Sequence, residues 1–279
     1  MKLLFDKVSF KASQLVTKEY STSFSLATKM LCSSIRQDIY NIYGFVRLAD
    51  EIVDSFQGYK QEDLFDDFEE QLYKALDNRI SLNPILNSFQ MTFHKYNLSI
   101  GYVEAFMKSM RSDLKKHTYD SKKDYEDYIY GSADVVGLMC LQVFVKGDRD
   151  TFVALKHSAM KLGSAFQKVN FLRDLKEDYD VLGRTYFPNV DLKTLNEQTK
   201  NALISEIELD FEKGYEGILS LPSEARFGVY VAYRYYKQLL INIAKTPAID
   251  IKNSRIRVPD YKKIALLTKS FVRFQLNVL

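Results

Sequence analysis

Two short segments of the sequence each contain a pair of aspartates four positions apart. The segment RLADEIVD contains Asp50 and Asp54, and the segment RDLKED contains Asp174 and Asp178. Residues i and i+4 lie on one face of an α-helix, and like charges at that spacing destabilise a helix by about 0.2–0.5 kcal/mol per pair. One such pair is usually a solvated face. Two pairs, each beside an arginine in an otherwise apolar helical segment, indicate a shared ligand.

A divalent cation with a diphosphate would explain why carboxylates gather in these segments. Mg²⁺ prefers oxygen ligands and typically binds one or two carboxylates together with substrate phosphates. Asn170 lies one helical turn before Asp174 and two before Asp178, so its amide oxygen is a candidate ligand; its alternative role is a hydrogen bond at the edge of the core. Arg47 and Arg173 are candidates for charge-assisted bonds to phosphate oxygens, and their alternative role is to neutralise the neighbouring acids.

Helical periodicity dominates the segments that must position these residues. Apolar residues recur at i, i+3, i+4 and i+7 before both acidic pairs, and scattered prolines and glycines separate about eight to ten predicted helices. The segment GVYVAYRYY at 228–236 has the β-branched and aromatic content of a strand, but its length and helical surroundings favour a helix. With only 11 Gly and 5 Pro and no linker, we predict one all-α domain over residues 1–279.

Composition restricts the possible partners. The chain is 46% hydrophobic, with 19 Tyr, 19 Phe and no Trp, which predicts either an ordinary large core or a pocket lined by rings. The net charge of +3 comes from well-mixed acids and bases, so no nucleic-acid partner is expected, although contact with an anionic membrane surface is compatible. Cys32 and Cys140 lack metal-ligand spacing and suit reduced thiols in the cytosol. The sequence contains no stretch of about 18 apolar residues, so no membrane-spanning helix is expected. Asp6 interrupts the first apolar segment too early for a secretory signal peptide.

Four blocks of the sequence resemble the squalene and phytoene synthases, the head-to-head branch of the all-α isoprenoid synthases. The blocks are Ser21, Ser23 and Phe24 within YSTSF, then YGFVRLADEIVD at 43–54, YIYGSADVVG at 128–137, and QKVNFLRDLKEDYDVLGRTYFP at 167–188. One DxxxD motif alone is weak evidence, whereas four blocks in order at the spacing of the family are strong. The resemblance extends from residue 20 to residue 263 and implies a single-domain isoprenoid-synthase helical bundle around a central cavity.

The resemblance also implies roles for individual residues. The implied ligands of Mg²⁺, or of Mn²⁺ in its place, and of the diphosphates are Asp50, Asp54, Asn170, Asp174 and Asp178. The implied basic contacts to the diphosphates are Arg47, Arg173 and Arg184. The tyrosines that would line the cavity and act in catalysis are Tyr43, Tyr130 and Tyr186. The remaining substrate contacts would be Ser21 and Ser23 near a head group, and Phe24, Val136, Gly137 and Gln167 in the cavity wall.

Two positions stay open within the resemblance. Either Arg255 or Arg257 could match a C-terminal arginine that binds phosphate, because the register of that segment is not fixed. Asp134 stands where the family usually has glycine. We expect its carboxylate either at the edge of the cavity or as the cap of a helical irregularity.

The activity implied by the resemblance is a Mg²⁺-dependent, head-to-head condensation of two geranylgeranyl diphosphates to phytoene in carotenoid biosynthesis. The intermediate would be a cyclopropylcarbinyl diphosphate, prephytoene diphosphate. The alternative is condensation of two farnesyl diphosphates to squalene or dehydrosqualene. The tail LKEDYDVLGRTYFP looks more like bacterial phytoene synthases, which end the reaction by losing a proton, so NADPH is not expected. The carbocations would need a cavity that excludes water, and aromatic faces attract cations.

Two rival classes of protein remain. A head-to-tail prenyltransferase usually shows DDxxD-type motifs, unlike DEIVD and DLKED here, and a non-catalytic assembly factor would tend to lose the acids that this chain keeps. The expected setting is the cytoplasm, with peripheral contact at the inner face of the membrane, because substrates and products are apolar. Downstream carotenoid enzymes are candidate partners.

Overall fold

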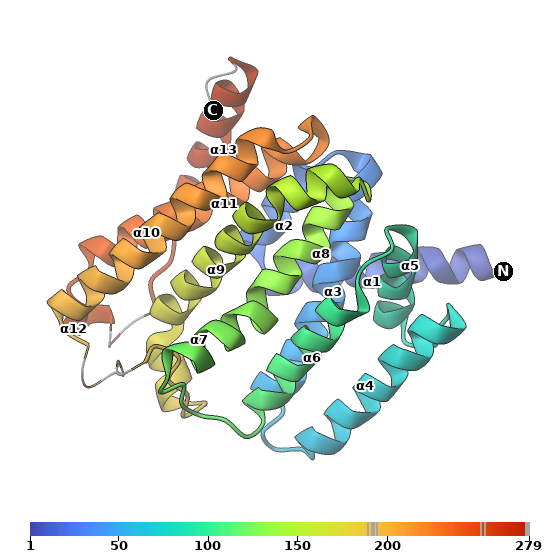
Figure 1. Ribbon diagram of the computed structural model, residues 1–279, viewed down its shortest axis with the longest axis horizontal. Helices are drawn as coiled ribbons and strands as arrows, with labels where there is room; N and C mark the ends of the chain where they lie inside the picture. Colours follow the sequence, from blue (N-terminus) through green and yellow to red (C-terminus); the bar gives the residue numbers. More distant parts are fainter. Residues whose placement is uncertain (189, 191–192, 194, 252, 254, 277–279) are drawn as a thin grey trace.

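The structure is a computed structural model that describes residues 1–188, 190, 193, 195–251, 253 and 255–276 (Figure 1). Its α-helices are α1 (Lys2–Tyr20), α2 (Thr22–Lys29), α3 (Ser33–Ser55), α4 (Gln61–Asn78), α5 (Pro84–Lys95), α6 (Ile100–Asp113), α7 (Lys122–Ile129), α8 (Val135–Phe144), α9 (Arg149–Asp180), α10 (Glu197–Ser220), α11 (Ser223–Lys245), α12 (Ala248–Ile251) and α13 (Asp260–Gln275). A π-helix, η1 (Tyr130–Asp134), joins α7 to α8.

The all-α prediction is confirmed. Within the described residues, the one pairing of β type is an isolated bridge between Thr118 and Thr185. The segment 228–236 lies inside α11 and is helical. The structure has more helices than the eight to ten predicted, because short helices such as α2 and α12 follow turns that apolar periodicity alone does not reveal.

The long helices α3 and α9 carry the two aspartate pairs near their C-terminal ends. Helix α3 buries an apolar stripe that includes Ile35, Ile39 and Ile42 against its neighbours. Helix α9 begins where Asp148 caps it by accepting a hydrogen bond from the backbone of Thr151 at 2.8 Å. It runs for 32 residues, a length of about 48 Å, and packs against α8, η1, α10, α11 and α12.

Two apolar clusters flank the centre of the bundle. In the first, Phe45 on α3 stacks on Phe89 with 4.0 Å between ring centroids and meets the edge of Phe106 at 5.3 Å. In the second, Phe171 on α9 stacks on Tyr186 with 4.1 Å between centroids. These clusters fix α3 and α9 on either side of the space that both helices line.

Close helix packing defines the wall between α9 and the η1–α8 segment. A Cβ atom on Gly163 of α9 would lie 2.9 Å from the carbonyl oxygen of Ala133, and one on Gly137 of α8 would lie 3.0 Å from the carbonyl oxygen of Ala159. Only glycine permits such an approach of one backbone to another. None of the described helices is both long enough and apolar enough to cross a bilayer.

The first cluster should carry a large share of the stability. Phe45 is fully buried, so Phe45→Ala should lower the free energy of unfolding by about 3–5 kcal/mol through lost burial and a cavity. Urea unfolding followed by circular dichroism would measure this. The control Leu82→Ala alters a side chain that is 93% exposed and should change stability by less than about 0.5 kcal/mol. Equal losses in both variants would contradict the assignment of Phe45 to the core.

Candidate active site

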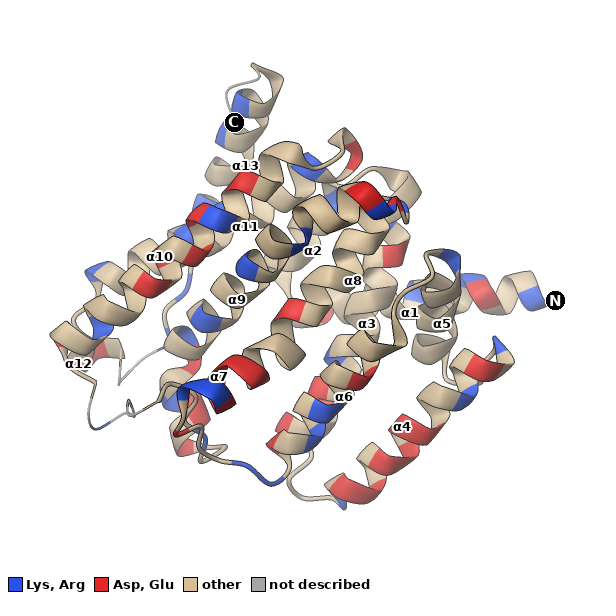
Figure 2. Ribbon diagram, viewed as in Figure 1, with Lys and Arg blue, Asp and Glu red and all other residues tan. Residues whose placement is uncertain are grey.

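The four aspartates meet at one end of the bundle. Arg184, in the segment after α9, joins the two helices. Its Nη1 donates to Asp54 Oδ1 at 2.5 Å, and its backbone N–H donates to the carbonyl oxygen of Asp178 at 2.8 Å. Figure 2 shows acidic and basic positions in close succession at the C-terminal end of α9. The two segments that the sequence separates by more than a hundred residues are therefore adjacent in space.

Arginines pair with three of the four aspartates. Arg47 pairs with Asp50 and with Glu51, and Arg173 pairs with Asp174. Asp174 also accepts from Arg255 Nε at 2.8 Å. Of the two candidate C-terminal arginines, Arg255 is thus the one that reaches the acidic end.

The pKa values of two of the acids, Asp178 and Asp50, are raised by burial and, after it, by the neighbouring like charges. Burial, followed by repulsion from Asp174 and Asp54, raises the pKa of Asp178 to about 8. Burial, followed by repulsion from Asp54, raises the pKa of Asp50 to about 7. Both carboxyls are therefore poised to gain from a nearby positive charge.

The donor set fits a hard divalent cation. Within the described ranges, no three Asp, Glu, His or Cys side chains already surround one point closely enough to hold a metal ion, and arginines pair with Asp50, Asp54 and Asp174. Asn170 Oδ1, however, is buried and has no hydrogen-bond partner among the described residues. A buried orphan oxygen one turn from a carboxylate pair is the kind of ligand that Mg²⁺ takes.

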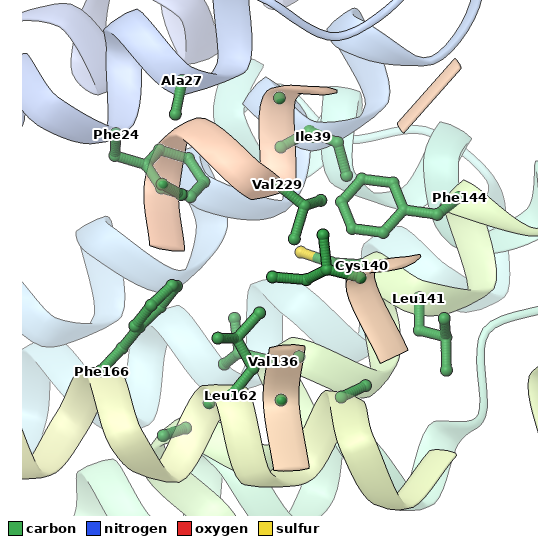
Figure 3. Close-up of a pocket in the computed structure, with 18 of the residues that line it drawn as sticks. Phe24, Ala27, Ile39, Val136, Cys140, Leu141, Phe144, Leu162, Phe166 and Val229 are labelled. Carbon is green, nitrogen blue, oxygen red and sulfur yellow. The ribbon is translucent and has the colours of Figure 1, made fainter. Parts of the chain in front are cut away.

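A mostly apolar cavity of about 280 Å³ lies beside the acidic end. In Figure 3, Phe24 and Phe166 border one side of it, and Leu141 and Phe144 border the opposite side. The candidate residues that line it are Phe24, Tyr43, Val136, Gly137, Gln167 and Asn170. Aromatic pairs stiffen the wall, because Phe24 stacks on Tyr43 with 4.5 Å between centroids and Phe166 stacks on Tyr236 with 4.1 Å.

A row of residues at four-residue spacing on α9 connects the cavity to the acids. Leu162, Phe166, Asn170, Asp174 and Asp178 follow one another at intervals of four residues. The first three line the cavity, and the last two belong to the acidic end. This row winds gradually around the helix axis and changes from apolar to amide to carboxylate over about four turns.

Tyr130 does not line the cavity, contrary to the expectation from the sequence. Its side chain is 38% exposed, and it is not among the described residues that border the cavity. Residues two positions apart on a helix lie on nearly opposite faces, and Tyr128 is the tyrosine of this segment that turns inward. Its hydroxyl donates to Asp113 Oδ2 at 2.7 Å.

Tyr186 also lies outside the cavity wall, in an aromatic cluster behind the acids. It is buried between Phe171 and Tyr128, at centroid distances of 4.1 and 5.2 Å, and its hydroxyl accepts from Arg184 Nη1 at 3.4 Å. The aromatic cluster therefore contacts Arg184 through the Tyr186 hydroxyl, and Arg184 in turn binds Asp54.

Asp113 is a member of this site that the sequence did not reveal. It is buried at the end of α6, accepts hydrogen bonds from the hydroxyls of Tyr119 and Tyr128, and burial raises its pKa to about 7. Its backbone carbonyl accepts from Arg184 Nη2 at 3.0 Å. No motif or acidic pair marks Asp113, so a sequence pattern could not find it.

The remaining candidates occupy less direct positions. Ser21 caps α2 by accepting from the backbone of Phe24 at 3.2 Å, and Ser23 lies half-buried in the first turn of that helix. Asp134 is buried, it is not among the described residues that border the cavity, and its side chain caps no helix. It accepts from Ser164 Oγ at 2.7 Å and thereby ties η1 to α9.

The raised pKa of Asp178 predicts a pH dependence of stability in the absence of divalent cations. The folded state binds a proton more tightly than the unfolded state, so stability is lost as pH rises from 3.8 towards about 8. The slope for one carboxyl reaches at most about 1.4 kcal/mol per pH unit. Asp178→Asn removes this titration and should flatten the dependence in urea unfolding with a chelator, whereas the exposed control Asp180→Asn should not. An unchanged slope in Asp178→Asn would count against this electrostatic assignment.

Comparisons with known proteins show which proteins the chain is similar to. The phytoene synthase of Arthrospira platensis is 29% identical over 290 residues, which cover 95% of this chain and 93% of that protein. The 15-cis-phytoene synthase of a Synechocystis strain is 27% identical over 297 residues, covering 96% and 86%. A crystal structure of a dehydrosqualene synthase with a ligand matches the fold with a TM-score of 0.82 at 24% identity, covering 97% of this chain and 98% of that one.

The last comparison confirms the expected isoprenoid-synthase bundle. The sequence model of the family described as squalene/phytoene synthase matches residues 17–262, which is most of the chain. The chain therefore belongs to the squalene/phytoene synthase family and is a prenyltransferase.

Proposed function

We propose that the protein condenses two molecules of geranylgeranyl diphosphate head to head into phytoene, through prephytoene diphosphate, in carotenoid biosynthesis. The observation that carries the proposal is the row of residues at four-residue spacing on α9 that runs from the apolar cavity to paired carboxylates, opposite a second pair on α3. Such a site can hold a diphosphate at one end and a prenyl chain at the other. The relatives named phytoene synthase support this choice of substrate.

The acidic end would hold the diphosphates through a divalent cation. The residues proposed to bind Mg²⁺, or Mn²⁺, are Asp50, Asp54, Asn170, Asp174 and Asp178. When bound, the cation supplies positive charge that offsets the charge developing on the departing diphosphate.

Basic side chains around these acids have two tasks in the proposed reaction. Arg47, Arg173 and Arg255 already pair with acids at the site, and a diphosphate would offer them oxygens for stronger, charge-assisted bonds. Arg184 is buried, with its guanidinium bonded to Asp54 and to two backbone carbonyls. Its proposed task is to hold the two helices at a fixed separation.

The cavity would protect the cationic intermediates. Its lining is mainly apolar, so water that would trap a carbocation as an alcohol is excluded. The faces of Phe24, Tyr43 and Phe166 can attract a cation, by up to about 2 kcal/mol each when desolvated. Burial raises the pKa of Tyr43 to about 12, so its hydroxyl stays neutral. The proposed reaction ends by proton loss from the final cation and uses no NADPH.

The proposed setting is the cytoplasm, with peripheral contact at the inner face of the membrane. Prenyl chains and a hydrocarbon product partition into lipid, so a site that opens near a bilayer shortens the path of both. Downstream carotenoid enzymes are the proposed recipients of the product.

Product analysis tests the choice of substrate. Purified protein with Mg²⁺ and geranylgeranyl diphosphate, but no NADPH, should release a C40 hydrocarbon, and a chelator should stop its formation. Turnover of farnesyl diphosphate alone, to squalene or dehydrosqualene, would overturn the geranylgeranyl assignment in favour of the shorter substrate.

Substitution of the acids tests the proposed binding of the diphosphate. Asp50→Asn and Asp174→Asn each remove a charged oxygen ligand, and each should lower kcat roughly 10²–10³-fold or more, while circular dichroism shows an unchanged helical fold. The matched control is Asp180→Asn, an exposed acid on the same helix as Asp174, which should retain activity. Full activity in either test variant would refute the proposed role.

A further inference from the structure

Helix α1 buries polar residues and exposes leucines, the reverse of an ordinary amphipathic helix. The residues that it buries against the bundle are Asp6, Ser9, Ser13 and Thr17. Helices normally bury an apolar stripe and expose polar residues. In α1 the most deeply buried positions are instead small or polar; Ala12 and Val16 pack against the core, but the leucines are left exposed.

The inner face of α1 is held by hydrogen bonds and close packing. Asn87 on α5 donates to Asp6 at 3.2 Å and to Ser9 at 3.1 Å. The hydroxyls of Ser13 and Ser88 lie 2.6 Å apart. A Cβ atom on Gly44 of α3 would lie 2.8 Å from Ser13 Oγ, so the two helices approach closely. The position of α1 is therefore fixed without burying its leucines.

The outer face of α1 combines exposed apolar residues with lysines. We define the α1 outer face as Leu3, Leu4, Lys7, Val8, Lys11, Leu15 and Lys18. The side chains of Leu4 and Leu15 are 69% and 58% exposed, and the first turns project beyond the rest of the bundle (Figure 1).

The lysines of the α1 outer face lack acidic partners. Lys7, Lys11 and Lys18 form no salt bridge with any described residue, whereas Lys2 pairs with Asp6. The acids of the helix are Asp6, which is turned inward, and Glu19 in the last turn. The positive charge along this face is therefore available to an anionic partner.

We propose that the α1 outer face binds the surface of a bilayer that contains anionic lipids. Helices that lie in a membrane interface place leucines in the acyl boundary beside lysines that attract anionic head groups, and the long lysine stems let their charged ends reach those groups. A symmetric pair of copies would bring the same patch of both chains together. It would then oppose lysine to lysine, so charge complementarity favours the lipid surface.

The α1 outer face also leads to the candidate active site. Tyr20, the last residue of α1, lies under the guanidinium of Arg47 at 4.5 Å, and Arg47 pairs with Asp50. A bilayer on α1 would thus lie along the helix that ends beside the proposed diphosphate site. The inference deepens the proposed function, because apolar prenyl substrates make such a contact useful.

Cosedimentation with vesicles at low salt tests the inference without substrate. The protein should bind vesicles of equal parts phosphatidylcholine and phosphatidylglycerol, and should release from them at high salt. The triple variant Lys7→Gln/Lys11→Gln/Lys18→Gln should weaken binding by about fivefold per lysine removed. Leu4→Gln/Leu15→Gln should weaken it roughly tenfold or more. Both variants should keep the thermal stability of the parent protein and its activity on detergent-dispersed substrate.

Matched controls carry the same changes elsewhere on the surface. Lys108→Gln/Lys123→Gln/Lys156→Gln removes three other exposed lysines, and Leu209→Gln on α10 removes another exposed leucine; both should bind like the parent. Helix α13 also exposes apolar residues, so Tyr261→Gln/Ile264→Gln/Val272→Gln is a further comparison.

Three results would overturn the inference. They are no vesicle binding by the parent protein, loss of binding through the α13 variant while both α1 variants bind normally, and α1 variants that only convert a dimer into a monomer. Vesicle binding through α1 by a protein that makes no prenyl product would instead contradict the proposed reaction and leave the membrane surface supported.

Discussion

Mutual repulsion among acidic groups is the constraint on which this structure depends. Asp50, Asp54, Asp174 and Asp178 converge at the ends of two helices, where burial strengthens their repulsion. Arg184 offsets this repulsion by joining the two helices: its guanidinium binds Asp54 of α3, and its backbone N–H binds the carbonyl oxygen of Asp178 of α9. These hydrogen bonds hold the acids together, so the site is arranged to receive positive charge before any ligand binds.

Aromatic rings and a buried carboxyl surround Arg184 and hold it in place. Tyr186, Tyr128 and Phe171 stack behind Arg184, and the buried carboxyl of Asp113 holds two tyrosine hydroxyls. Aromatic rings add area burial with few rotatable bonds, so they suit a place where small displacements would separate charges. The polar site and the second apolar cluster are thus parts of one arrangement.

Much of this architecture could be predicted from the sequence because it depends on local periodicity. Spacing alone predicted the helices and the paired aspartates, and the resemblance to a family named several residues, such as Phe24 and Gln167, that border the cavity. The expectation that Tyr130 lines the cavity came from the resemblance alone; in the structure Tyr128, two residues earlier and on nearly the opposite helical face, is the tyrosine that turns inward. Asp113 could not be found, since its role arises only when α6 meets the segment after α9.

The glycines of the cavity wall limit how the site can be altered. At Gly163 and Gly137, neighbouring helices touch main chain to main chain, so a larger side chain at either position would force the helices apart. Room for a longer hydrocarbon must therefore come from bulky side chains that border the cavity, such as Phe144 and Leu141 of α8 (Figure 3). Changes in the length of the accepted substrate are therefore expected at a few side chains, whereas the width of the cavity is set by the contacts between helix backbones.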